Sequence, residues 1–125
     1  MKYIRLFEDW QPNEIVFVEI PESIPQFRSY DILYQGEKAG TLDLSFLHEE
    51  LEEDELEISG LILKEKFQAK GIGKKIISAM WREFPKANRI FLQSIESATG
   101  FWRKMGAVNF PGRPNYLVIK RSRFT

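Results

Sequence analysis

Short apolar segments separated by turn residues fill the first 47 positions of the chain. The pattern predicts four strands, at Tyr3–Phe7, Ile15–Ile20, Tyr30–Tyr34 and Leu42–Leu47. Turn-forming residues lie between them, at Gln11-Pro12-Asn13, from Pro21 to Pro25 and at Gln35-Gly36. In the fourth segment, apolar and polar residues alternate with a period of two, which is typical of a strand with one buried face.

The second half of the chain adds helical periodicity. Leu56–Leu63 is apolar enough for a central strand, and Gly60 inside it indicates a bulge. Gly71-Ile72-Gly73 opens a helix in which apolar residues recur at helical spacing until Pro85 ends it. The pattern then predicts a strand at Arg89–Ser94, a helix at Ser97–Met105, and strands at Ala107–Phe110 and Tyr116–Lys120. This order predicts one domain over residues 1–125, of the α/β (α+β) class. Its sheet is expected to be mixed and mostly antiparallel, with a central strand–helix–strand crossover.

Composition excludes several classes of protein. The chain has 125 residues, 43% of them hydrophobic and 14% aromatic, which suits a packed core and argues against disorder. It contains no cysteine and one histidine, His48, so disulfide scaffolds and Cys- or His-rich metal sites are not expected. Its apolar runs are at most four residues long and its N-terminus has no apolar signal region. We therefore expect a cytoplasmic protein with no membrane contact and no bound metal.

Opposite charges are segregated along a chain whose formal net charge is zero. Residues 1–59 carry four basic and 15 acidic side chains, or −11, and residues 60–125 carry 14 basic and three acidic side chains, or +11. Seven of the nine residues from Glu49 to Glu57 are acidic, and the middle of this run is expected in an exposed hairpin loop, with a simply solvated face as the alternative. The asymmetry indicates two oppositely charged ligands if the basic half also contains an anion-binding device.

Such a device is predicted where the central strand leads into the helix, in Gln68-Ala69-Lys70-Gly71-Ile72-Gly73. Backbone N–H groups at a helix N-terminus bind phosphate oxygens, and glycines let the backbone approach the ligand closely. Lys66, Lys70, Lys74 and Lys75 surround this turn. The segment is neither a P-loop, since no Ser or Thr follows Gly-Lys, nor a dinucleotide fingerprint, since the third glycine is missing. Alone, the two glycines are a weak signal.

Two motifs in the expected order resemble those of the GNAT family of N-acetyltransferases. Gln-x-x-Gly-x-Gly, from Gln68 to Gly73, resembles the family's [Gln/Arg]-x-x-Gly-x-[Gly/Ala] segment. Ala98-Thr99-Gly100-Phe101-Trp102-Arg103-Lys104-Met105-Gly106-Ala107 resembles its Ala-x-x-Phe-Tyr-x-Lys-x-Gly-Phe segment. The resemblance covers residues 38–120 well and the first 37 poorly. It implies the GNAT acyl-CoA N-acyltransferase fold and acetyl-coenzyme A as the acetyl donor.

The resemblance also implies which residues would form the site. The pyrophosphate of the cofactor would lie on Gln68, Ala69, Lys70, Gly71, Ile72, Gly73 and Lys74. The backbone of Leu61, Ile62 and Leu63 would meet its pantetheine arm and the acetyl carbonyl, and Phe101 would pack nearby. Glu57 lies eleven residues before the motif glutamine, where the histone acetyltransferase branch has its general base. A solvated carboxylate or a plain core residue is the alternative for Glu57 and Phe101, respectively.

The sequence departs from the family pattern at two places. Trp102 stands where many members have a tyrosine as general acid, and an indole N–H cannot serve as an acid at neutral pH. The nine residues from Pro21 to Ser29 are too few for the helix pair that usually follows the first strand. The chain is thus expected to be a small variant whose acceptor site is open or is completed by a partner chain, such as a second copy in a homodimer.

These inferences favour an acetyl-coenzyme A-dependent N-acetyltransferase. A primary amine of a cationic acceptor would attack the thioester directly in a ternary complex, with Glu57 or water taking its proton. A small amine, a polyamine or a lysine-containing peptide or protein would suit the acidic half. The alternative is a non-catalytic module of this fold that binds coenzyme A or a protein partner. Nucleic acid is not expected as a partner, because the basic residues from Lys120 to Arg123 are too few, and they are expected to form a solvated tail.

Overall fold

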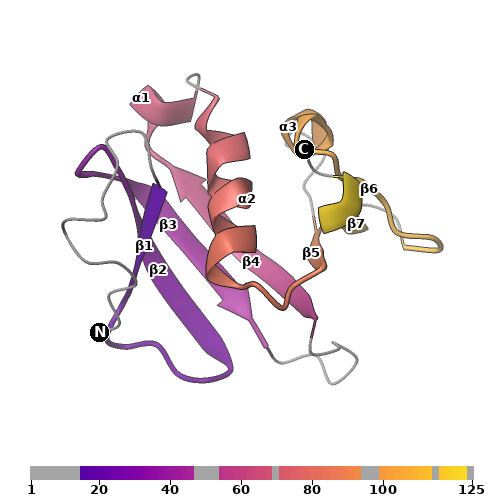
Figure 1. The fold of residues 1–125 in the computed structure, drawn as a ribbon, viewed down its shortest axis with the longest axis horizontal. Helices are drawn as coiled ribbons and strands as arrows, with labels where there is room; N and C mark the ends of the chain where they lie inside the picture. Colours follow the sequence, from indigo (N-terminus) through magenta and orange to yellow (C-terminus); the bar gives the residue numbers. More distant parts are fainter. Residues whose placement is uncertain (1–14, 47–53, 69–70, 94–98, 114–115, 124–125) are drawn as a thin grey trace.

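The computed structural model describes residues 15–46, 54–68, 71–93, 99–113 and 116–123. Their strands form one seven-stranded sheet in the order β1-β2-β3-β4-β5-β7-β6 (Figure 1). The strands are β1 (Ile15–Glu19), β2 (Phe27–Tyr34), β3 (Glu37–Ser45), β4 (Glu55–Leu63), β5 (Arg89–Gln93), β6 (Val108–Asn109) and β7 (Tyr116–Lys120). β4 and β5 are parallel, and every other neighbouring pair is antiparallel. The predicted fold class is therefore confirmed. The predicted strand at Tyr3–Phe7 lies outside the described residues.

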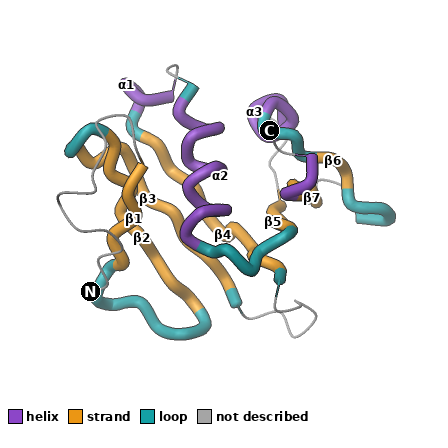
Figure 2. Tube along the Cα trace, viewed as in Figure 1, coloured by secondary structure: helices purple, strands orange, loops and turns teal. Residues whose placement is uncertain are grey.

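Helices α1 (Glu65–Gln68) and α2 (Ile72–Glu83) form the crossover between the two parallel strands. α2 lies along one face of the sheet, as both ribbon and tube show (Figures 1 and 2). Its buried side chains include Ile72, Ile76, Ile77 and Met80, which are at most 1% exposed and belong to the main core. This spacing of three and four residues is what the sequence predicted for this helix. α1 was not predicted, because its segment is polar apart from Phe67, which is buried.

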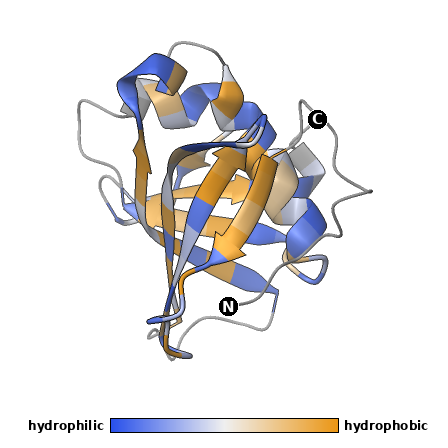
Figure 3. Cartoon of the chain, turned by 90° about the vertical axis from the view of Figure 1, so that its left-hand side faces the viewer, coloured by the Kyte–Doolittle hydropathy of each residue, from blue (hydrophilic) through white to orange (hydrophobic). Residues whose placement is uncertain are grey.

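The central strand β4 requires two local irregularities. Asp43 pairs with Gly60 whereas Leu44 pairs with Ile58, so Ser59 is an extra residue on β4 and the predicted bulge is confirmed next to Gly60. On β3, a Cβ atom at Gly40 would lie 1.9 Å from the carbonyl oxygen of Ile62. Only glycine therefore allows the two backbones to approach this closely. Figure 3 shows that hydrophobic residues, in orange, occupy much of the length of the strands.

β4 and β5 part halfway along β4. Their parallel pairing runs from Glu55 opposite Arg89 to Ile58 opposite Leu92. β4 continues to Leu63 and stays paired with β3 on its other side. Within the described residues, the last five residues of β4 thus have no neighbouring strand on the β5 side. This fork is the feature of the fold that positions the candidate site.

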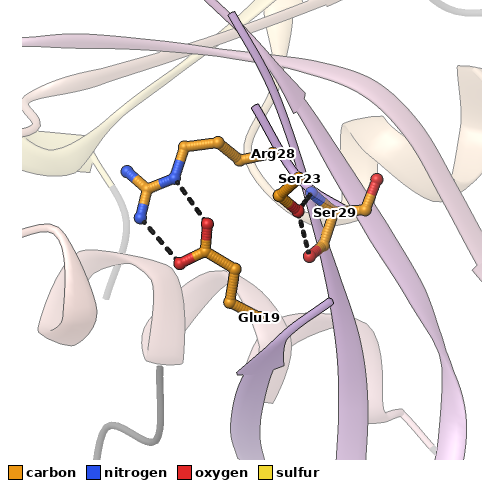
Figure 4. Close-up of polar contacts among 4 residues, drawn as sticks. All are labelled: Glu19, Ser23, Arg28 and Ser29. Atoms are coloured by element: carbon orange, nitrogen blue, oxygen red, sulfur yellow. Dashed lines mark hydrogen bonds and ion pairs between the residues drawn. The ribbon is translucent and has the colours of Figure 1, made fainter. Parts of the chain in front are cut away.

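The connection between β1 and β2 contains no helix, as predicted for a small variant. Residues 20–26 form a short turn region with one isolated bridge between Ile24 and Phe27. Figure 4 shows the contacts that fasten it: the Arg28 guanidinium donates to both carboxylate oxygens of Glu19 at 3.1 and 3.2 Å. The Ser29 N–H donates to Ser23 Oγ at 2.9 Å. Side-chain hydrogen bonds and an ion pair therefore stabilise this turn.

The C-terminal part consists of α3 (Thr99–Lys104), the β6–β7 pair and the 3₁₀ helix η3 (Arg121–Arg123). The basic residues here were expected to form a solvated tail, and for Arg121 that was wrong. Its guanidinium donates to the backbone carbonyls of Trp81, Phe84, Pro85 and Ala87 at 2.8–3.3 Å, and lies 5.1 Å from the Trp81 ring centroid. Arg121 thus closes the C-terminal end of α2. No helix in the described part of the chain has the length and hydropathy to cross a bilayer.

Candidate active site

An open cavity of about 330 Å³ lies beside the free end of β4. Leu61 and Leu63 line it from β4, Gln68 from α1, and Phe101 and Trp102 from α3. Phe101 and Trp102 pack edge to face with ring centroids 5.0 Å apart. Four of the five lining side chains are apolar. Three of these apolar residues, Leu61, Leu63 and Phe101, are among those that the GNAT resemblance predicts to bind the cofactor.

The backbone of β4 turns its polar groups toward this cavity at alternate residues. The Ile62 carbonyl lies against β3 at Gly40, and the Lys64 N–H donates to the Ala39 carbonyl at 2.8 Å. Since alternate residues of a strand direct their N–H and C=O groups to opposite sides, Leu61 and Leu63 direct theirs away from β3, into the fork. The Leu63 carbonyl accepts a hydrogen bond from Gln68 Nε2 at 2.9 Å, whereas the N–H and C=O of Leu61 and the N–H of Leu63 stay directed toward the cavity. The Ile62 side chain points away and is 67% exposed.

The N-terminus of α2 is built to attract an anion. Gly71 precedes it in the left-handed conformation, with φ 67°, and no side chain caps the helix. Lys74 and Lys75 are exposed in its first turn and make no ion pair with another described residue. Cations at a helix N-terminus are unfavourable unless an anion binds there, because the helix dipole is positive at this end. Lys66 is less available than predicted, since it pairs with Glu37 at 2.6 Å. Ala69 and Lys70 lie outside the described residues.

Gly73 has a different role from the one that its place in the motif indicates. It is buried, and a Cβ atom on it would lie 2.9 Å from Phe101 Cζ and 3.2 Å from Met105 Sδ. The missing side chain therefore lets α3 pack against α2. The space that was expected to admit a phosphate holds an aromatic ring of the cavity wall. Around the Cβ position of Gly71, by contrast, the described residues beyond its chain neighbours place no heavy atom within 4 Å.

Glu57 lies at the fork, one residue before the last pair between β4 and β5. It is half-buried, and because Leu56 and Ile58 enter the core beneath α2, its side chain points to the opposite face of the sheet. The Tyr116 hydroxyl on β7 donates a hydrogen bond to Glu57 Oε2 at 3.1 Å. Burial and then the nearby Glu57 carboxylate raise the pKa of Tyr116 to about 12. No sequence pattern indicated this tyrosine, which lies 59 positions from its partner.

Only the end of the acidic segment, from Asp54 onward, lies within the described residues. Arg89 Nη2 lies 2.8 Å from Glu55 Oε2 and 3.6 Å from Asp54 Oδ1. Asn88 also donates to the Asp54 carboxylate at 3.2 Å. These two carboxylates thus share the single Arg89 guanidinium, and the contacts hold the start of β4 to the start of β5. Residues Glu49 to Glu53 lie outside the described residues.

Trp102 occupies the position where many GNAT enzymes have a tyrosine. Its side chain is 8% exposed and forms part of the cavity wall and of the core. The geometry thus gives this residue a packing role, in keeping with an indole that has no acid chemistry. In the described residues, the only hydrogen-bonded pair of an acid and a phenol at the fork is Glu57 with Tyr116.

Comparison with known proteins decides the family. The sequence profile of the acetyltransferase (GNAT) family matches residues 2–107. This protein belongs to that family. The family takes its acetyl group from acetyl-coenzyme A, so the predictions of an acetyltransferase and of its donor are confirmed. No curated protein shows significant sequence similarity to the chain.

Solved structures of this GNAT protein's relatives share its fold at low sequence identity. Tetrahymena GCN5 superposes with a TM-score of 0.61 at 12% identity, over 82% of this chain and 72% of that one. Campylobacter jejuni N-acetyltransferase PseH, in complex with acetyl coenzyme A, gives 0.58 at 16% identity, over 78% and 70%. Vibrio cholerae spermidine N-acetyltransferase gives 0.57 at 18% identity, over 78% and 67%. The GNAT-like fold expected from the two motifs is therefore confirmed.

Proposed function

We propose that this protein transfers the acetyl group of acetyl-coenzyme A to a primary amine of a cationic acceptor. The observation that carries the proposal is the fork. It joins an apolar cavity, an exposed strand backbone and a lysine-bearing helix N-terminus on one side with a carboxylate on the other. Each part matches one requirement of the reaction: holding an apolar arm, polarising a carbonyl, binding phosphates and accepting a proton.

The residues present fit acetyl-coenzyme A. Its phosphates would lie on the uncapped N-terminus of α2 next to Gly71, with Lys74 and Lys75 supplying opposite charge. Its pantetheine arm would lie in the cavity against Leu61 and Phe101. Gln68 would support the strand end through its bond to the Leu63 carbonyl. The cofactor supplies a thioester whose carbonyl carbon accepts the amine.

Two groups of the chain would act on the reaction itself. The Leu61 N–H faces the fork and would donate a hydrogen bond to the carbonyl oxygen as negative charge develops there. Glu57 would take the proton of the amine, directly or through one water, as the amine attacks. The leaving thiolate would receive its proton from water, because Phe101 has no acidic proton and the indole N–H of Trp102 cannot serve as an acid. This is a direct transfer in a ternary complex.

A cationic acceptor is favoured by the charge of the chain. The first 59 residues carry −11, and they supply β1, β2, β3 and the first half of β4. Negative potential raises the local concentration of a cation near the site. The Vibrio cholerae neighbour is named for spermidine, a polyamine, which adds a first acceptor to try. Because no helix covers the β1–β2 connection, a lysine-bearing peptide is the second.

The first experiment separates binding from turnover. Thermal unfolding is followed with and without acetyl-coenzyme A, and a ligand at ~100 times its dissociation constant should add roughly 2.7 kcal/mol. The Lys74→Gln/Lys75→Gln variant should lose several-fold in affinity, since it removes charges near the phosphates. Lys86→Gln, an exposed lysine beyond the other end of α2, is the matched control. No stabilisation at millimolar cofactor would refute the cofactor site.

The second experiment tests catalysis. Release of free coenzyme A is measured with spermidine and with a lysine-rich peptide as acceptors. Transfer to either supports the proposal. If the protein binds acetyl-coenzyme A tightly but acetylates neither amine, the result supports the non-catalytic module. That alternative is motivated by the missing helix tyrosine and the missing helix pair.

A further inference from the structure

The Glu57–Tyr116 contact spans a strand that lies between its two partners. Glu57 stands on β4 opposite Phe91 of β5, and Tyr116 stands on β7 opposite Gln93 of β5. The tyrosine therefore reaches across β5 to place its hydroxyl 3.1 Å from Glu57 Oε2. A tyrosine side chain is long enough for this only if its ring lies over the sheet.

Aromatic packing holds the Tyr116 ring in that orientation. It stacks on Phe91, with centroids 5.9 Å apart and an interplanar angle of 19°. Phe110 packs edge-on against both rings, at 5.6 Å from Tyr116 and 5.7 Å from Phe91. The Arg113 guanidinium lies 5.4 Å from the Tyr116 centroid. The phenol is thus fixed on the helix-free side of the sheet before any acceptor arrives.

The phenol also keeps its proton over the working range of an acetyltransferase. Burial and the Glu57 carboxylate raise the pKa of Tyr116 to about 12, and Glu55 adds to the rise while Arg113 opposes it. Tyr116 is therefore a permanent donor to Glu57 and does not compete with it as a base. A carboxylate that accepts a fixed hydrogen bond loses the rotational freedom of its long side chain.

We propose that Tyr116 is the positioning residue for the base Glu57, holding its carboxylate at the point where β4 and β5 part. This inference rests on the proposed function, because it assigns Tyr116 a role through Glu57. Trp102 stands where the helix would carry a tyrosine, and Tyr116 on β7 places a tyrosine next to the reacting groups instead. The phenol orients the base and does not itself protonate the thiolate.

The test is Tyr116→Phe, which keeps the aromatic stack and removes the hydroxyl. With spermidine or the lysine-rich peptide as acceptor, kcat should fall about tenfold, less than the ~10²–10⁴-fold typical of losing the base itself. KM for acetyl-coenzyme A should stay unchanged, since its cavity is lined by other residues. The acid limb of the pH–rate profile should move to higher pH, because a carboxylate deprived of a donor takes up a proton more readily.

The matched control is Tyr30→Phe. Its hydroxyl is buried in the core with no hydrogen-bond partner among the described residues, so its removal should leave the rate and the profile as they are. A purely structural role for Tyr116 would lower stability without moving the acid limb. Urea unfolding of both variants separates that effect from the kinetic one.

A double-mutant cycle with Glu57→Gln completes the test. If Tyr116 acts through Glu57, Tyr116→Phe should cost nothing further once Glu57 is an amide. If the two substitutions instead lower kcat independently, so that their losses multiply in the double variant, the positioning role is overturned. It is also overturned if Glu57→Gln is slow but Tyr116→Phe leaves the pH–rate profile unchanged. A wild-type rate that Glu57→Gln does not alter would remove Glu57 as the base and would overturn the positioning role with it. No acetyl transfer at all would instead refute the proposed function.

Discussion

Gly71 and Gly73 belong to one motif, yet the structure requires them for different reasons. Gly71 has φ 67° and open space around its Cβ position, so its requirement is conformational. Gly73 lies under the Phe101 ring, so its requirement is steric. The sequence predicted both positions as important but assigned them one cause. A motif of two glycines does not show which neighbour each will meet.

Gly71→Ala should therefore lower the free energy of unfolding by about 1–2 kcal/mol, because an L residue in the left-handed region carries that cost. Urea unfolding measures it. Gly100→Ala is the control: this glycine lies in α3, has no heavy atom within 4 Å of its Cβ position, and is not in the left-handed region. That variant should be neutral or up to ~1 kcal/mol more stable. Equal effects at both sites would contradict the conformational explanation.

Gly73→Ala should act on the cavity. The new Cβ, 2.9 Å from Phe101 Cζ, must displace the ring that lines the proposed pantetheine site. We expect several-fold weaker binding of acetyl-coenzyme A, measured by calorimetry. Phe101→Leu, combined with Gly73→Ala, should recover part of the affinity, since the smaller side chain makes room for the methyl group. A double variant that binds no better than Gly73→Ala would remove the steric explanation.

At the scale of elements, α2 depends on a residue that follows β7. Arg121 donates to four backbone carbonyls around the end of the helix, which would otherwise lack partners in the helix itself. Arg121→Gln should lower the free energy of unfolding by roughly 1.5–3 kcal/mol, the range for hydrogen bonds with a charged partner. Lys120→Gln, the exposed neighbour on β7, should change it little. Similar urea midpoints for the two variants would contradict this.

Most elements were predictable because their periodicity is local. Apolar residues at helical spacing predicted α2 from Ile72 onward, and alternation predicted β3. α1 was missed, because four residues with one apolar side chain, Phe67, show no period. The fork was also beyond prediction, since it depends on where the pairing of β4 with β5 stops, at Ile58.

At the scale of the whole molecule, the site combines residues that are distant in sequence. Glu57, Leu61, Leu63 and Phe101 were all predicted from the resemblance to the family, Glu57 through the position of the base relative to the motif glutamine. Tyr116 could not be predicted, because its contact with Glu57 requires the strand order β4-β5-β7 and a ring lying over β5. Pairing order across a sheet is a property of the folded chain, and no local pattern reports it.

Two tyrosines give the folded state a defined sensitivity to alkali. Burial raises the pKa of Tyr30 to about 12, with the Arg28 guanidinium opposing the rise, and Tyr116 is raised to about 12 as well. In the unfolded chain both ionise near the ordinary value of 10.0. Their contribution to stability is therefore complete below about pH 10 and is lost as the pH rises toward 12, because only the unfolded state releases these protons in that window.

Tyr30→Phe isolates one of these contributions. It removes a buried hydroxyl that has no hydrogen-bond partner among the described residues, so its stability at pH 8 should equal or exceed that of the wild type. Between pH 10 and pH 12 its free energy of unfolding should fall less steeply than that of the wild type, since one ionising group is gone. Lysine and arginine titration is common to both proteins and cancels in the difference. Urea unfolding at pH 8, 10.5 and 11.5 measures the slopes, and parallel slopes would show that the Tyr30 phenol ionises as easily in the folded protein as in the unfolded chain.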